Sequence, residues 1–210
     1  MRLYKLNDTV LSLKGNASKL LGGLTSNSLD KPFNAFLSLH GRIIATFRQQ
    51  RISDDEYLII IPNFVVDQLL KHLELYLKLN GTQVHESSLK AYVDVDTAGL
   101  VLKDEEVSAQ VSEEEFTAFR LENYLPLLGV DYQQDEFLLN IDEATFVSFA
   151  KGCFLGQEPV AKVHNRSKPT RKLVIKFEDE CTDEEKGKLT SKAADPTTGR
   201  MRGFVFVRNL

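Results

Sequence analysis

The 210-residue chain carries, at positions 151–158, the stretch Lys151-Gly152-Cys153-Phe154-Leu155-Gly156-Gln157-Glu158. It places a cysteine between two glycines, two residues after a lysine and just before an expected helix start. A nearby cation and a helix N-terminus both lower the pKa of a thiol and favour its reactive thiolate. The flanking glycines let the backbone turn and approach a ligand closely. The stretch therefore predicts a functional thiol at Cys153 assisted by Lys151, against the alternative of a buried structural cysteine.

This octapeptide resembles, at every defined position, the signature K-G-C-[FY]-x-G-Q-E of the YgfZ family. Members of that family are folate-binding proteins related to the T-protein (aminomethyltransferase) of the glycine cleavage system. Further segments are similar to family motifs and follow the family's order: residues 20–27, 36–44, 119–126, 129–132 and 140–144. The chain from residue 172 onward matches only loosely, and it is shorter than the family's C-terminal β-barrel.

The resemblance implies the T-protein-like fold, a three-part ring with folate held in a central hole. The pattern of elements also indicates an α+β protein with mainly antiparallel sheets, because strands and helices mix without a regular β-α-β rhythm. We expect a T-protein-like folate-binding region over residues 1–165. A short C-terminal β segment, the reduced remnant of the barrel, is expected over residues 166–210.

Local patterns predict individual elements. Residues 112–115 form an S-x-x-E capping box that opens a helix, and Gln157-Glu158-Pro159 suits the first turn of another. Alternation and periodicity predict a hairpin within 2–14, a short helix at 17–24, a hairpin at 34–48 turning at His40-Gly41, a strand at 57–61, a helix from about 63 to 79, short β segments at 90–95 and 100–103, and two final strands at 173–177 and 204–207.

The resemblance also implies site residues. By matched position, Glu122 is the carboxylate that accepts hydrogen bonds from the pterin ring of tetrahydrofolate or a derivative. A carboxylate can accept two hydrogen bonds from the adjacent N–H groups of an aminopyrimidinone, although Glu122 also fits an exposed helix charge. Arg42 follows a hairpin turn and faces either the site or a sheet surface. The remaining cofactor-binding positions implied by the signature are Gly156, Gln157 and Glu158.

One departure separates the possible functions. Aminomethyltransferases carry a G-G-x-x-D-D segment after this hairpin, where one aspartate handles the reacting folate nitrogen. The aligned residues here are Gly41-Arg42-Ile43-Ile44-Ala45-Thr46, so no carboxylate is available at Ala45 or Thr46 for proton transfer. This difference, with Lys151 and Cys153 present, favours a YgfZ-like role: a tetrahydrofolate-binding protein that aids assembly or repair of iron–sulfur enzymes.

Two rival functions stay open at this stage. The first is a tetrahydrofolate-dependent aminomethyltransferase, so whether the chain is an enzyme is undecided. The second is a cysteine hydrolase that uses His164 as its base, for which no third orienting residue is identifiable. The expected partners are the folate ligand and iron–sulfur client proteins.

Composition excludes other classes. A net charge of −4 argues against generic nucleic-acid binding. The longest apolar run, at 57–61, is far too short to cross a bilayer, and no export signal opens the chain. Two cysteines fit a reducing cytoplasm better than a disulfide framework, and the four scattered histidines lack metal-site spacing. We therefore expect a cytoplasmic protein with no metal site.

Two features after the signature carry further expectations. The first is a basic cluster that is either a solvated surface or a seat for an anionic ligand tail or acidic partner: Lys162, Arg166, Lys168, Arg171 and Lys172. The second is Cys181, whose neighbours at 178–185 are mostly acidic. Nearby carboxylates disfavour a thiolate, and we expect this polar segment to be accessible.

Overall fold

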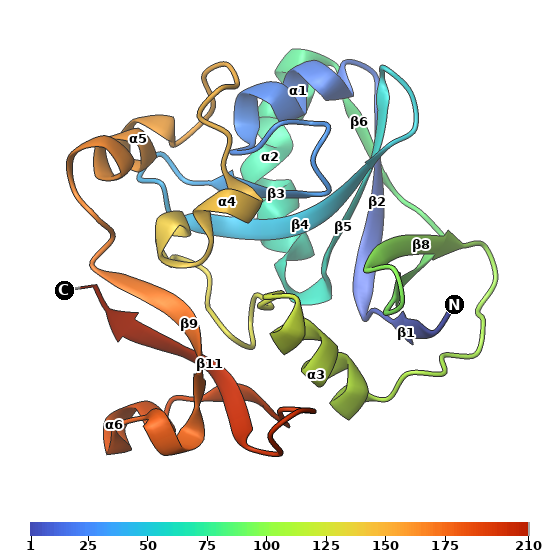
Figure 1. Cartoon of the computed structure of the whole chain (residues 1–210). Helices are drawn as coiled ribbons and strands as arrows, with labels where there is room; N and C mark the ends of the chain where they lie inside the picture. The colour runs from blue at the N-terminus through green and yellow to red at the C-terminus, as the bar shows by residue number, and fades with distance from the viewer. Residues whose placement is uncertain (210) are drawn as a thin grey trace.

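The computed structural model describes residues 1–209 and shows three antiparallel sheets with helices packed around them (Figure 1). Every paired strand in these sheets runs antiparallel to its neighbour. The predicted α+β class is therefore confirmed. Within the described residues, no helix has the length and apolar character needed to cross a membrane.

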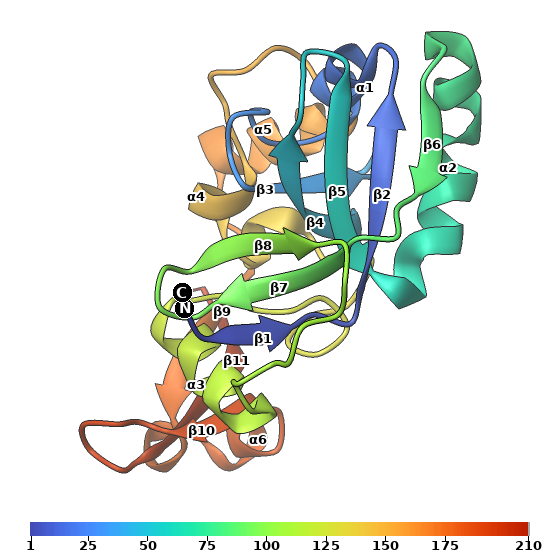
Figure 2. The same cartoon turned by 90° about the vertical axis from the view of Figure 1, so that its right-hand side faces the viewer.

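The largest sheet holds five strands in the order β3-β4-β5-β2-β6: β2 (Asp8–Lys14), β3 (Phe33–Leu37), β4 (Ile43–Arg51), β5 (Glu56–Pro62) and β6 (Gln83–Glu86). The predicted hairpin is confirmed as β3–β4, and Gly41 in its turn has a φ of +71° that favours glycine. The helices α1 (Ala17–Leu24) and α2 (Val66–Asn80), the latter preceded by the 3₁₀ turn η1 (Asn63–Val65), pack on this sheet (Figure 2). Gly81 ends α2 in the left-handed conformation, as the sequence predicts.

The second sheet has the order β1-β7-β8 and consists of β1 (Leu3–Lys5), β7 (Lys90–Asp94) and β8 (Gly99–Lys103). The hairpin expected within residues 2–14 is wrong, because β1 pairs with β7 while β2 pairs with β5 and β6. The helix α3 (Glu113–Glu122) begins at the predicted capping box. It joins β1 through Phe116, whose ring stacks on Tyr4 with centroids 3.7 Å apart.

The C-terminal sheet lies beside α3 and below the five-stranded sheet in Figure 1. It consists of β9 (Arg171–Phe177), β10 (Thr190–Ala194) and β11 (Met201–Arg208), in the order β10-β11-β9. Along the chain, η3 (Glu178–Glu180) and α6 (Asp183–Lys186) connect β9 to β10. Two strands were expected here, and β10 is the one that the sequence pattern missed. Leu173 and Phe204 of this sheet are fully buried in the main hydrophobic core.

A buried ion pair joins the second sheet's helix to the C-terminal sheet. Arg120 of α3 donates to Asp131 at 2.7 Å, and their side chains are 3% and 0% exposed. Asp131 also accepts hydrogen bonds from Thr190 and Ser191 of β10, at 2.7 and 2.5 Å. Arg120 donates to Ser191 at 2.6 Å as well. The ion pair therefore fixes the position of the C-terminal sheet.

Two short elements and one longer helix complete the described chain: η2 (Leu138–Asn140), α4 (Glu143–Phe146) and α5 (Gln157–Arg166) with its N-cap at Gly156. The helix α5 starts where the first-turn pattern predicts. The division expected between residues 165 and 166 falls at the last residue of α5, just before the chain enters β9.

Candidate functional site

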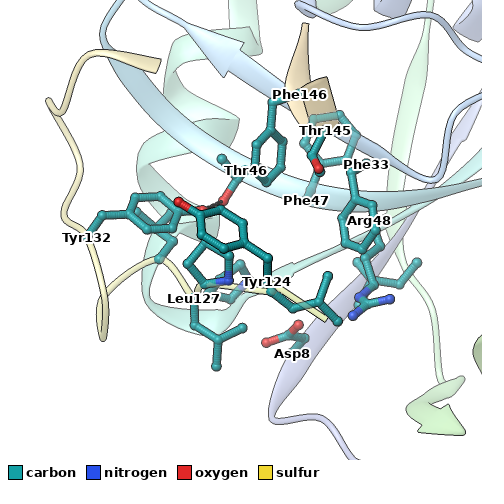
Figure 3. A pocket seen from close by; sticks show the side chains of 15 residues that line it. Asp8, Phe33, Thr46, Phe47, Arg48, Tyr124, Leu127, Tyr132, Thr145 and Phe146 are labelled. Atoms are coloured by element: carbon teal, nitrogen blue, oxygen red, sulfur yellow. Dashed lines mark hydrogen bonds between the residues drawn. The ribbon is translucent and has the colours of Figure 1, made fainter. Parts of the chain in front are cut away.

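The best-defined pocket lies where β2, β4 and β5 meet the segment that follows α3. Its cavity volume is about 70 Å³, and the space free of protein atoms reaches about 540 Å³ when the part open to solvent is included. Its lining comes from six parts of the chain: Asp8, Phe33, Thr46, Phe47, Arg48, Ile60, Pro62, Tyr124, Leu125, Pro126, Leu127, Leu128, Tyr132, Thr145 and Phe146. Aromatic rings form much of the wall, so the pocket suits a flat apolar-faced ligand (Figure 3).

Thr46 reaches this pocket because side chains alternate along β4. Its neighbour Ala45 is fully buried in the core, whereas Thr46 forms a 2.6 Å hydrogen bond with the Tyr132 hydroxyl at the pocket wall. Burial raises the pKa of Tyr132 above its ordinary value, so the hydroxyl stays neutral. Of Ala45 and Thr46, the two positions at which the sequence resemblance leads us to look for an aspartate, Thr46 is the one in the pocket, and it is neutral and hydrogen-bonded.

Tyr124 connects the pocket to two other parts of the molecule. Its ring lines the pocket and packs edge-on against Phe204 of β11, with centroids 5.6 Å apart. Its hydroxyl donates to the carbonyl oxygens of Leu173 in β9 and, at 3.3 Å, of Ile141. This wall of the pocket is consequently held by the C-terminal sheet.

Asp8 and Arg48 contribute the charged groups of the pocket. Asp8 opens β2 and Arg48 lies in β4, on either side of β5, and Figure 3 shows both side chains at the same side of the pocket. Burial raises the pKa of Asp8 to about 6, with Arg48 acting in the opposite direction. Burial lowers the pKa of Arg48 to about 10, partly offset by Asp8. Within residues 1–209, neither side chain has a hydrogen bond or an ion pair closer than 4 Å.

The raised pKa of Asp8 predicts a pH-dependent cost. The folded chain binds this proton more tightly than the unfolded chain does, so the cost is absent below about pH 4 and complete above the folded pKa of about 6. We expect Asp8→Asn to raise the free energy of unfolding by about 2–3 kcal/mol at pH 8, at 1.36 kcal/mol per pKa unit. Urea unfolding at pH 4 and pH 8 measures it; the exposed Asp30→Asn is the matched control, and equal gains at both pH values would contradict the assignment.

The signature loop lies outside this pocket. Lys151 extends into the protein and donates from Nζ to the carbonyl oxygens of Thr25 at 2.5 Å and Asn27 at 3.0 Å. Burial lowers the pKa of Lys151 to about 8. The backbone N–H of Leu155 donates to the Gly23 carbonyl at 2.9 Å. These contacts attach the loop to the end of α1 and to the residues that follow it.

The two thiols have opposite environments. Cys153 is exposed, whereas Cys181 is 8% exposed and donates from Sγ to the Phe177 carbonyl at 3.3 Å. The expectation that Cys181 is accessible is wrong, because Leu189 and Val205 pack with it into a small apolar cluster. Burial raises the pKa of Cys181, and the carboxylates expected to do so add less.

We expect Cys153 to react with iodoacetamide before Cys181, since only Cys153 is exposed and the pKa of Cys181 is raised. Alkylation across a pH series, followed by peptide mass mapping, gives the rate and midpoint for each thiol. The exposure difference scales the rates, while each midpoint reports the thiol's pKa. A midpoint for Cys153 at or above that of Cys181 would leave Cys153 an ordinary surface thiol.

The signature residues after Cys153 have contacts with the β3–β4 hairpin and the loop. Gly156 has a φ of +81°, and a Cβ there would collide with the Ser38 carbonyl oxygen of the hairpin. Gln157 accepts a hydrogen bond from the backbone N–H of Phe154 at 3.4 Å, and Glu158 is exposed in the first turn of α5. None of the three lines the pocket, and Gly156 is the one that lies against the hairpin.

The other two residues expected at the cofactor also lie outside the pocket lining. Glu122 ends α3, is 47% exposed and lies 3.9 Å from the Arg202 guanidinium. Arg42 is exposed, donates to the Asp135 carbonyl at 3.3 Å and lies over the Phe137 ring. The structure thus does not gather the residues chosen by motif. It gathers Asp8 and Arg48, which the motifs did not indicate, with an aromatic wall to which the motif segments 119–126 and 129–132 contribute Tyr124 and Tyr132.

His164 has contacts other than those of a hydrolase base. Its Nδ1 lies 3.0 Å from a Glu143 carboxylate oxygen, and its ring stacks on Phe149 with centroids 3.9 Å apart. In the described part of the chain, no hydrogen bond joins His164 to Cys153, so the structure offers no Cys–His pair.

Comparison with known proteins identifies the fold. No protein-family model matches the chain, and no curated protein is similar to it. Among solved structures, the chain is similar to the glycine cleavage system aminomethyltransferase T from Bartonella henselae, with a TM-score of 0.72 and 14% identity, over 98% of this chain and 78% of that one. At this identity the similarity shows the fold, which is T-protein-like as expected from the sequence.

Proposed function

We propose that this protein binds tetrahydrofolate or a derivative in the pocket lined by Asp8, Arg48 and Thr46, and that it aids assembly or repair of iron–sulfur enzymes. The observation that carries the folate half is the pocket itself. Aromatic rings flank a half-buried carboxylate there, which suits a flat pterin ring with N–H donors on one edge. The T-protein-like fold supports the same ligand class, because its solved neighbour is an aminomethyltransferase of the glycine cleavage system.

The iron–sulfur half of the proposal rests on the signature loop. Its likeness to the YgfZ octapeptide covers Lys151 through Glu158, and Cys153 is exposed where a client protein can reach it. One thiol is too few to hold a cluster by itself, since clusters are held by several cysteine ligands. Cys153 would therefore act on a client's cluster or its ligands transiently, with Lys151 positioning the loop through Thr25 and Asn27.

A tetrahydrofolate-dependent aminomethyltransferase is the second candidate. Thr46 cannot take a proton from a folate nitrogen, which disfavours that reaction. Asp8 favours it, because a carboxylate whose pKa lies near 6 is in the same pocket. Supplying tetrahydrofolate with an aminomethyl donor and measuring methylenetetrahydrofolate separates the two candidates. Turnover that is lost in Asp8→Asn would establish the transferase.

Calorimetric titration with tetrahydrofolate under anaerobic conditions tests the shared half of both candidates. We expect saturable one-site binding at sub-millimolar concentration. The deletion of the gene, with measurement of iron–sulfur enzyme activities, tests the other half, and Cys153→Ser should fail to restore them where wild type succeeds. No binding to tetrahydrofolate at sub-millimolar concentration would overturn the proposal for the pocket.

The basic cluster predicts an effect of the folate's polyglutamate tail. Lys162, Arg166, Lys168 and Lys172 are exposed, whereas Arg171 pairs with Glu136. We expect affinity to rise with tail length at low salt and to lose that dependence as salt screens the charges. Calorimetry with mono- and pentaglutamyl 5-formyltetrahydrofolate measures it. Lys162→Gln/Arg166→Gln should reduce the dependence, with Lys71→Gln on the exposed side of α2 as control; equal affinities for the two forms at low salt would contradict the prediction.

A further inference from the structure

We infer that Asp8 and Arg48 together recognise the aminopyrimidinone edge of the ligand, with Asp8 accepting from its ring N–H and amino group and Arg48 donating to its carbonyl oxygen. The inference rests on the proposed folate function and names the residues that select the ligand. It assigns the pterin-binding carboxylate to the first strand of the large sheet rather than to Glu122.

The Asp8 and Arg48 side chains lie in the same pocket without a protein partner in the described residues. Asp8 and Arg48 project from β2 and β4 past the intervening β5 and lie together at one side of the pocket (Figure 3). Each lacks a hydrogen-bonding or ion-pairing partner within residues 1–209. Asp8 and Arg48 are half-buried, and charges withdrawn from water are normally paired and hydrogen-bonded, because an unsatisfied charge is costly. Two opposite charges in one pocket, both without a protein partner in the described residues, therefore indicate a ligand that pairs with both.

The donors and acceptors along an aminopyrimidinone edge are complementary to a carboxylate beside a guanidinium. An aminopyrimidinone presents, in sequence along one edge, an amino donor, an N–H donor and a carbonyl acceptor. A carboxylate takes the two donors in parallel, and a guanidinium beside it supplies a donor for the carbonyl. The Arg48 guanidinium is held over the Phe33 ring at 4.6 Å, which keeps it beside the pocket. The pair thus presents the complementary order of acceptor, acceptor and donor.

Glu122 lies outside the pocket and is therefore less suited than Asp8 to bind the pterin ring. Its carboxylate is about half exposed at the end of α3 and lies near Arg202, outside the pocket lining. A carboxylate in water contributes little to ligand discrimination, since its hydrogen bonds exchange with solvent. Of the two carboxylates, Asp8 is the one that lines the pocket and is half-buried, whereas Glu122 is exposed.

The experiment compares two isosteric substitutions by calorimetry with 5-formyltetrahydrofolate. We expect Asp8→Asn to weaken binding about 10- to 100-fold, the scale of a lost charged hydrogen bond in a buried site. Glu122→Gln, the matched control, should bind as wild type does. Thermal unfolding shows that each variant is folded, and Asp8→Asn should be the more stable protein. Loss of affinity in Glu122→Gln with Asp8→Asn unchanged would overturn the inference while leaving the folate function intact.

A second measurement tests Arg48 through the ligand. Folic acid and its 4-amino analogue aminopterin differ along the edge that the pair would contact: the carbonyl acceptor becomes an amino donor, and the ring nitrogen beside it loses its hydrogen. We expect wild type to prefer folic acid by about 10-fold or more at pH 8. Arg48→Met should reduce this preference, leaving the part that arises from Asp8, and Arg42→Met outside the pocket should retain it in full. A wild type that binds tetrahydrofolate but shows no preference would overturn the role of Arg48, whereas absence of all folate binding would overturn the proposed function instead.

Discussion

Asp131→Asn will lower the free energy of unfolding by about 3–5 kcal/mol, the cost of leaving one member of a buried ion pair without its partner. The substitution keeps the side-chain shape but removes the charge that compensates Arg120, whose side chain is 3% exposed. It also disturbs the hydrogen bonds that Asp131 accepts from Thr190, Ser191 and the backbone of Leu127. Urea unfolding followed by far-UV circular dichroism measures the loss.

The control for this prediction is an ion pair in water. Glu74→Gln removes the charge paired with Lys78 at 2.6 Å on the exposed surface of α2. Surface pairs contribute little, so its unfolding midpoint should match wild type within error. Equal effects of Asp131→Asn and Glu74→Gln would mean that the buried pair does not hold the C-terminal sheet in place.

Gly156→Ala is expected to destabilise the protein by about 3 kcal/mol, from a left-handed backbone together with overpacking. Gly156 has a φ of +81°, and its added Cβ would meet the Ser38 carbonyl oxygen and approach Leu37 Cβ to 3.1 Å. Both obstacles belong to the β3–β4 hairpin and cannot yield as a flexible side chain would. Thermal and urea unfolding measure the effect.

Gly152→Ala is the matched control, because it lies in the same octapeptide and a Cβ there meets nothing within 4 Å. We expect this variant to unfold like wild type. Equal losses for the two glycines would show that the loop tolerates neither side chain for a reason other than the hairpin contact.

The sequence predicts the local elements of this fold well. The β3–β4 hairpin, the helix α2 and the capping box of α3 each follow from residues within one short window. The prediction of a hairpin at 2–14 was wrong because the pairing of its first strand is not local. Leu3 pairs with Asp94, a partner far along the chain that no local alternation can reveal. The strand β10 was missed because its residues, Thr190–Ala194, are small and polar and lack the apolar alternation of a strand.

The candidate site shows the same division. Motif positions such as Glu122, Gly156 and Gln157 are visible in sequence because they lie in contiguous signatures. Asp8 and Arg48 lie far apart in the sequence and come to one pocket because β2 and β4 both pair with β5. One signal was present in sequence. Arg48 comes directly after the mostly apolar residues 43–47, and a charged side chain is unusual at the end of such a run.

The strand order of the C-terminal sheet has a consequence for biosynthesis. β11 is the middle strand, so β9 and β10 have no sheet partner until residues 201–208 have left the ribosome. Until then, Tyr124 at the pocket wall lacks its contact with Phe204. Asp131 also lacks a fixed hydrogen bond from Thr190, because β10 is not yet held in the sheet. Nascent chains halted before this strand should therefore remain open to proteases and unable to retain ligand. The C-terminal sheet and the pocket wall that it holds can therefore fold completely only after the last strand has been synthesised.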